Sequence, residues 1–202
     1  AGIKVDLILR SLGALSVELA RQNIPLLVRT AERFADAPGT LMALAHEHRC
    51  GTLVFNREYE INERRRDDAV LAAFHSAGLG AEAFHDQVLL PPGDVRTAED
   101  KGGYYTVFSR FKRAYYRELE AGGLDEGVAQ VLGTPAKQAE TGIKPDKVPD
   151  RVSGFESHVP SARCEELWGA GEGAAYRRLR SFIDGSIGRY KELRDRPSVD
   201  AT

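Results

Sequence analysis

Cysteine is scarce in this chain of 202 residues, and its placement excludes two classes of protein. The two cysteines, Cys50 and Cys164, lie far apart and form no C-x-x-C pair. A disulfide framework or a zinc knuckle needs several cysteines at close, regular spacing. We therefore expect a reduced, cytoplasmic protein that holds no metal.

Long apolar runs and an excess of one charge are also absent. No stretch approaches the roughly 20 apolar residues that span a bilayer, so we expect no membrane segment. The formal net charge is -2 and the pI is near 6.3, so the chain is not basic overall. Any nucleic-acid contact must therefore come from a local basic patch. The apolar content of 42% is sufficient for a hydrophobic core.

The usual signatures of phosphate, metal and nucleophile sites are missing as well. The glycines of 169–173 lack the G-x-G-x-x-G spacing and surround Glu172, so we interpret them as a plain helix start. His46 and His48 flank Glu47, but residues two apart point to nearly opposite faces of a helix. No G-x-S-x-G motif is present. We therefore identify no catalytic residue from the sequence.

In the first 93 residues, segments whose apolar residues recur at helical spacing alternate with short continuous apolar runs. This alternation of predicted helices and strands is typical of parallel βα units. The predicted helices cover 4–22, 37–48 and a segment capped near Asn62, and the predicted strands cover 24–28, 52–55 and 87–90. We therefore predict an α/β fold.

After Gly93 the pattern changes. A helix is predicted over 107–120, and a last helix over 172–193. Residues 121–163 show no sustained period, and a loop of this length is uncommon inside a compact domain. We therefore interpret 121–163 as an interdomain connector.

The segment Tyr104–Arg117 interleaves aromatic side chains with four cations. This composition can stack bases and hold phosphates. It also suits an amphipathic helix with its aromatic side chains turned inward and its arginines outward. From spacing alone, the second interpretation is favoured.

The stretch 56–68, directly after the strand 52–55, consists mostly of charged or amide-bearing residues. Ligands of parallel α/β sheets bind at the carboxyl ends of the strands, so Asn62 and Glu63 could face a heterocycle there. The alternative is a solvated helix with Glu60–Arg64 and Arg64–Asp68 pairs and an Asn62 cap.

Four segments together resemble the DNA photolyase/cryptochrome family: 55–67, 88–93, 105–113 and 190–197. The resemblance implies a Rossmann-like parallel sheet that is incomplete at its N-terminal side, then a long connector and the first helix of an all-α domain. The corresponding parts are an antenna domain at 1–120, the connector at 121–163 and the start of a helical FAD-binding domain at 164–202.

The resemblance also implies a function. Members of the family that are deoxyribodipyrimidine photolyases split cyclobutane pyrimidine dimers in damaged DNA, using light and reduced FAD, with methenyltetrahydrofolate as antenna. By position, Asn62 and Glu63 match the residues that contact the folate, and Tyr190 and Thr202 match residues at the FAD. The resemblance implies a monomer.

The sequence departs from the family pattern in places. Arg110 stands where many relatives have proline, and both ends of the pattern are missing. We expect an internal piece of a photolyase that is inactive alone. The isolated piece should be either poorly soluble or rearranged, with 24–28 sliding against 52–55. Two alternatives stay open: a cryptochrome blue-light photoreceptor, and a free-standing nucleotide-binding α/β module.

Overall fold

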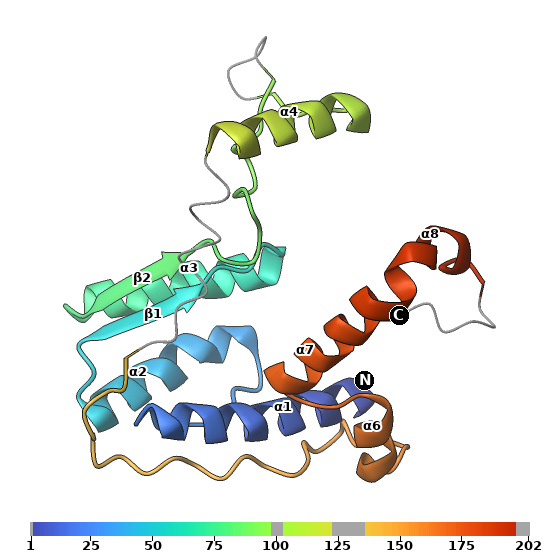
Figure 1. Ribbon diagram of the computed structural model, residues 1–202. Coiled ribbons are helices and arrows are strands. Elements are labelled where there is room, and N and C mark those ends of the chain that lie inside the picture. Colours follow the sequence, from blue (N-terminus) through green and yellow to red (C-terminus); the bar gives the residue numbers. More distant parts are fainter. Residues whose placement is uncertain (1, 98–102, 123–135, 197–202) are drawn as a thin grey trace. The chain divides into compact units, whose positions relative to one another are not determined.

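The computed structural model describes residues 2–97, 103–122 and 136–196. The chain forms two compact units: one consists of Arg29–Thr134, and the other combines Ala1–Val28 with Pro135–Thr202. Figure 1 shows the course of the chain through its helices and strands.

The unit Arg29–Thr134 is built around two parallel strands. Strand β1 pairs with β2 so that Thr52 lies opposite Gly80 and Asn56 opposite Phe84. The predicted α/β fold is confirmed, as are the strand at 52–55 and the helices at 37–48 and 107–120. The elements are a 3-10 turn (Phe34–Asp36), α2 (Ala37–His48), β1 (Thr52–Asn56), α3 (Ile61–Ser76), β2 (Gly80–Phe84) and α4 (Phe108–Ala121).

The core of this unit lies between the sheet and the helices α2 and α3. Val70 and Phe74 are four positions apart, so they share one face of α3, and both are buried with Ala45 and Ala81. Full burial of a side chain such as Phe74 contributes about 1.5–3 kcal/mol. The opposite face of β1 exposes Val54, so the sheet is covered on one face by this core.

The second strand lies earlier in the chain than the sequence predicts. The prediction of a strand at 87–90 is wrong, because the strand occupies Gly80–Phe84 and Val88 and Leu89 are exposed. The turn after α3 is short and uses Gly78 at a φ of 72°, which brings the chain back to the sheet at once. A side chain at Gly80 would meet Thr52, so the glycine permits the pairing.

The other unit is mainly helical. Helix α1 confirms the predicted helix at 4–22, and the predicted helix at 172–193 is helical throughout but changes type along its length. The elements are α1 (Gly2–Arg21), α6 (Ser161–Leu167), α7 (Glu172–Ser181), a π-helical turn (Phe182–Ser186), a 3-10 turn (Ile187–Arg189) and α8 (Tyr190–Leu193).

Residues 24–28 form no strand, so that prediction and the expected slide against 52–55 are both wrong. Their backbone bonds to Asp146 instead: the Leu26 carbonyl accepts from the Asp146 N–H at 2.9 Å, and the Val28 N–H donates to the Asp146 carboxylate at 2.8 Å. Prolines at 145 and 149 have no N–H to donate, so no continuous ladder can form along this part of the chain.

Helix α1 is joined to α6 through the side chain of Asp6. The Ser161 hydroxyl donates to Asp6 at 2.5 Å and the Arg10 Nε donates to it at 2.9 Å, while Arg10 also donates to the Trp168 carbonyl at 2.9 Å. The Ser161 hydrogen bond lowers the pKa of Asp6 most, and the Arg10 contacts lower it further against the opposing effect of burial. These contacts hold α6 against α1.

Candidate functional site

Polar side chains gather where β1 and β2 end, at the same edge of the sheet. The Asn56 amide donates to the Asp86 carboxylate at 3.1 Å. The Tyr59 hydroxyl lies 2.9 Å from His85 Nδ1, and the two rings stack with centroids 5.7 Å apart and planes 9° apart. We call residues 56–59 with His85 and Asp86 the polar edge. It occupies the position where parallel α/β sheets bind ligands.

A buried carboxylate lies behind the polar edge. Asp67 is 2% exposed; its Oδ2 accepts from the Glu58 backbone N–H at 3.2 Å, and its Oδ1 accepts from Arg66 at 2.7 and 3.0 Å. Arg66 also donates to the Glu58 carboxylate at 2.6 Å, and its guanidinium lies 5.6 Å from the centre of the Phe34 ring. We call these four residues the Asp67 network.

The Asp67 network fixes the loop between β1 and α3. Burial disfavours the charged form of Arg66, but hydrogen bonds to Asp67 and Glu58 outweigh this effect and raise the pKa of the guanidinium. The arginine therefore keeps its charge and stays bonded to both acids. Because the Glu58 N–H is held by a buried acceptor, the loop that carries Tyr59 has one fixed course.

Asn62 and Glu63 lie in the first turn of α3. Asn62 is exposed and does not cap the helix, because α3 begins at Ile61 and Glu60 holds the cap position. Glu63 is half-buried, and its side chain has no hydrogen bond or ion pair within the described ranges. Its carboxylate is therefore available to a ligand. Neighbouring positions on a helix point in different directions, so the two side chains diverge.

The alternative interpretation of this stretch, a ladder of surface ion pairs, is wrong in its details. Neither Glu60–Arg64 nor Arg64–Asp68 forms among the ion pairs of the described residues. The arginine that pairs is Arg66, and it does so inside the unit. The sequence did contain a signal for the burial of Asp67. Asp67 lies three positions before Val70 and seven before Phe74, so it shares the apolar face of α3 with them.

The two residues matched to FAD are not brought together by the described part of the chain. Tyr190 opens α8, and its ring meets the edge of Phe182 with centroids 5.6 Å apart and planes at 89°. Thr202 lies outside the described residues. A large cofactor needs a mostly enclosed pocket, and one tyrosine gives only a fragment of a wall.

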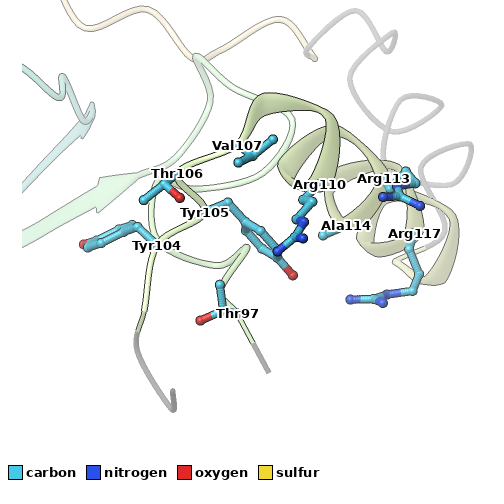
Figure 2. Close-up of a pocket in the computed structure, with 9 residues that line it drawn as sticks. All are labelled: Thr97, Tyr104, Tyr105, Thr106, Val107, Arg110, Arg113, Ala114 and Arg117. Atoms are coloured by element: carbon cyan, nitrogen blue, oxygen red, sulfur yellow. The ribbon is translucent and has the colours of Figure 1, made fainter. Parts of the chain in front are cut away.

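Helix α4 and the segment before it line a cavity of about 480 Å³. Figure 2 shows Arg110 beside the Tyr105 ring, with Arg113 and Arg117 further along the same helix. The prediction that the aromatic side chains of this helix turn inward is only partly correct. Phe111 and Tyr115 are half-buried, while Phe108 and Tyr116 are exposed. The residues that line the cavity are Thr97, Tyr104, Tyr105, Thr106, Val107, Arg110, Arg113, Ala114 and Arg117.

The described ranges contain neither a candidate metal site nor a helix that could span a membrane. No group of three or more His, Cys, Asp or Glu side chains in residues 2–97, 103–122 and 136–196 is placed to hold a metal ion. Within the same ranges, each helix is too short or too polar to span a bilayer.

Comparison with protein families places the chain. The model of the DNA photolyase family matches residues 1–131, which is more than half of the sequence. The chain belongs to the DNA photolyase family. The resemblance seen in the sequence motifs is thereby confirmed.

Curated relatives and a solved structure extend the similarity to the whole chain. It is 31% identical to the deoxyribodipyrimidine photo-lyase of Escherichia coli, over 98% of this chain and 39% of that protein. It is 30% identical to the protein of the same name from Vibrio cholerae, over 100% of this chain and 41% of that protein. A bacterial class III photolyase from Agrobacterium tumefaciens superposes with a TM-score of 0.68 at 26% identity, over 100% of this chain and 40% of that one.

The chain thus spans about two fifths of the length of these relatives.

Proposed function

We propose that this chain is part of a light-dependent deoxyribodipyrimidine photolyase that repairs cyclobutane pyrimidine dimers in DNA. The observation that carries the proposal is the 31% identity to the Escherichia coli deoxyribodipyrimidine photo-lyase over 98% of the chain. The relatives compared above carry the photolyase name, so we do not favour the cryptochrome alternative. In the protein we propose, bound FAD would supply the electron that splits the dimer.

We assign 1–120 to an antenna domain, 121–163 to a connector and 164–202 to the start of the helical FAD-binding domain. We also propose that the protein is a cytoplasmic monomer that acts on damaged DNA. The 202 residues alone would bind no stoichiometric FAD, because Tyr190 and Thr202 supply too little of a pocket.

The first turn of α3 fits a folate antenna in the chemistry of its side chains. We assign Glu63 as the acceptor for the heterocycle's N–H groups, because its half-buried carboxylate has no competing partner in the described ranges. Asn62 would supply an amide that can donate and accept, and its exposure leaves it accessible to a ligand. The fixed loop at Glu58 keeps the first turn of α3 in place for both.

The activity is tested on the full-length protein that contains this chain, loaded with FAD. An oligonucleotide with one cyclobutane dimer is mixed with the protein and kept dark or illuminated, and the intact dimer is measured by chromatography. We expect dimer loss only in the light. A flavin-loaded protein that binds this DNA and leaves the dimer intact under illumination would refute the proposal.

The folate assignment is tested separately in the same protein. Glu63→Ala should lower the folate content per chain about tenfold, because a site built to pair with a ligand N–H loses most of its affinity without that acceptor. Dimer splitting by direct excitation of the flavin should stay unchanged. Asp68→Ala, an exposed acid on the same helix, is the matched control. Equal folate content in the Glu63→Ala variant and the parent would overturn the assignment.

A further inference from the structure

Three arginines on α4 share one face of the helix. Arg110, Arg113 and Arg117 are spaced by three and four residues, which places their side chains next to one another, and all three line the cavity of about 480 Å³. Figure 2 shows them along one helix, with the Tyr105 ring beside Arg110. The cavity is of a size that holds a nucleotide-sized group.

This surface has positive charge that the described part of the chain does not neutralise. Arg110 and Arg113 form no ion pair with a described residue, and Arg117 contacts only the neighbouring Glu118, at 3.3 Å on the surface. The first turn of α4 contains no acid, and its cap residue, Val107, has no side chain that could bond the free N–H groups. Because Val107 also lines the cavity, the positive end of the helix dipole adds to the arginine charges.

The basic surface continues around the helix. A second cavity of about 520 Å³ shares Arg113 and Arg117 with the first and adds Lys112 and Tyr116. Ser109 and Glu120 complete its lining, so three cations stand there against one carboxylate. The Lys112 ammonium lies 5.9 Å from the centre of the Tyr116 ring. Two adjoining cavities with shared arginines form a track longer than a single small ligand requires. We call it the α4 track.

An exposed tyrosine stands in each half of the α4 track. Tyr104 is 70% exposed and Tyr116 is 54% exposed. The Arg96 guanidinium stacks 4.1 Å from the centre of the Tyr104 ring, which supports the ring from one side. Flat aromatic rings beside a row of cations are the elements that bind bases and phosphates of single-stranded nucleic acid.

We propose that the α4 track binds single-stranded nucleic acid, with Arg110, Arg113 and Arg117 on successive phosphates and Tyr104 stacked on a base. The planar guanidinium pairs with two phosphate oxygens at once, and the tyrosines provide stacking surface that an acidic peptide would not use. A duplex keeps its bases stacked inside and gains nothing from the rings. The site does not depend on the repair activity, because it requires neither a lesion nor light.

The test measures binding of a fluorescein-labelled 12-nucleotide thymidine strand to the 202-residue chain, in the dark, by fluorescence anisotropy at several salt concentrations. The double variant R110Q/R113Q should bind at least about tenfold more weakly and reduce the salt slope by roughly 1.4, because each phosphate contact contributes about 0.7. R110K/R113K keeps the charge and should bind within about threefold of the parent. Tyr104→Ala should weaken binding about fivefold or more, whereas Tyr104→Phe keeps the ring and the affinity.

The matched control is R64Q/R65Q, which removes two exposed arginines from α3 with the same change in net charge. It should leave the affinity within about twofold of the parent. Three results would overturn the proposal: equal weakening by R64Q/R65Q and R110Q/R113Q, no weakening by R110Q/R113Q, or binding of a 12-residue polyglutamate as tight as that of the thymidine strand. Each of these results leaves the photolyase assignment untouched, since no damaged base is present.

Discussion

Helices α3 and α4 carry arginines in similar number but use them differently. On α3, the half-buried Arg66 donates hydrogen bonds to Glu58 and Asp67, two acids from the same stretch of sequence. On α4, Arg110 and Arg113 form no ion pair within the described ranges and line an open cavity. The residue type is the same, and the neighbouring carboxylates decide its role.

This contrast shows how an arginine-rich helix should be interpreted. Where the chain supplies a buried acceptor such as Asp67, the arginine guanidinium is bonded within the protein and stabilises a loop. Where the chain supplies none, the positive charge is available to an external anion. The three predictions that follow test this contrast, and they run from the largest expected effect to the smallest.

The largest effect is expected from the buried acid. Asp67→Ala should lower the free energy of unfolding by about 3–5 kcal/mol, because it leaves Arg66 and the Glu58 N–H without their buried acceptor. Urea denaturation of the full chain followed by circular dichroism measures this change. The adjacent exposed Asp68→Ala should change it by less than about 0.5 kcal/mol. Similar losses for the two variants would show that the Asp67 network does not stabilise the unit.

A smaller effect is expected when the two kinds of arginine are compared directly. Arg66→Gln should cost about 1–2 kcal/mol, since it removes charge-assisted hydrogen bonds to Asp67 and Glu58. Arg113→Gln makes the same chemical change at an exposed position and should stay within about 0.5 kcal/mol of the parent. Thermal unfolding of both variants provides the measurement. The contrast fails if Arg113→Gln destabilises as much as Arg66→Gln.

The smallest effect concerns Asp6, where an arginine and a carboxylate meet in the other unit. The pKa of Asp6 is lowered from its ordinary value of 3.8 in the folded chain, chiefly by the Ser161 hydroxyl. Its contribution to stability is therefore complete above pH 3.8 and disappears as the pH falls through the lower, folded-state pKa. Asp6→Asn should make the stability of the chain less dependent on pH in this acid range, by less than about 1 kcal/mol. Urea unfolding midpoints measured from pH 5 to pH 2 check this prediction. The same fall of the midpoint with pH in the variant and the parent would contradict it.

The helices of this protein could be predicted from sequence because their apolar periods are local. The spans 4–22, 37–48 and 107–120 all coincide with helices within a few residues. Strands were harder, because a short apolar run does not reveal its partner. The run at 24–28 bonds to Asp146, and residues 80–84 pair with β1 although they carry less apolar character than 87–90.

The site was predictable to a similar degree. The position of Asn62 and Glu63 after a strand followed from sequence, since the strand at 52–55 is real and its end is polar. The Tyr59–His85 pair was not foreseen, because it joins residues 26 positions apart that meet only when β1 and β2 lie side by side. The exposure of Tyr104 was likewise beyond an argument from spacing, because Tyr104 lies before α4 and helical periodicity does not extend to it.

The π-helical turn at Phe182–Ser186 has a consequence for how this part of the chain tolerates insertions and deletions. A π turn and a 3-10 turn occupy the positions from Phe182 to Arg189, and the rings of Phe182 and Tyr190 lie with their centroids 5.6 Å apart. A deletion of the single residue Gly185 would remove the extra residue of the π turn and rotate everything after it by about 100°. Homologues that differ in length at this point would therefore present a different side chain at the place that Tyr190 occupies here.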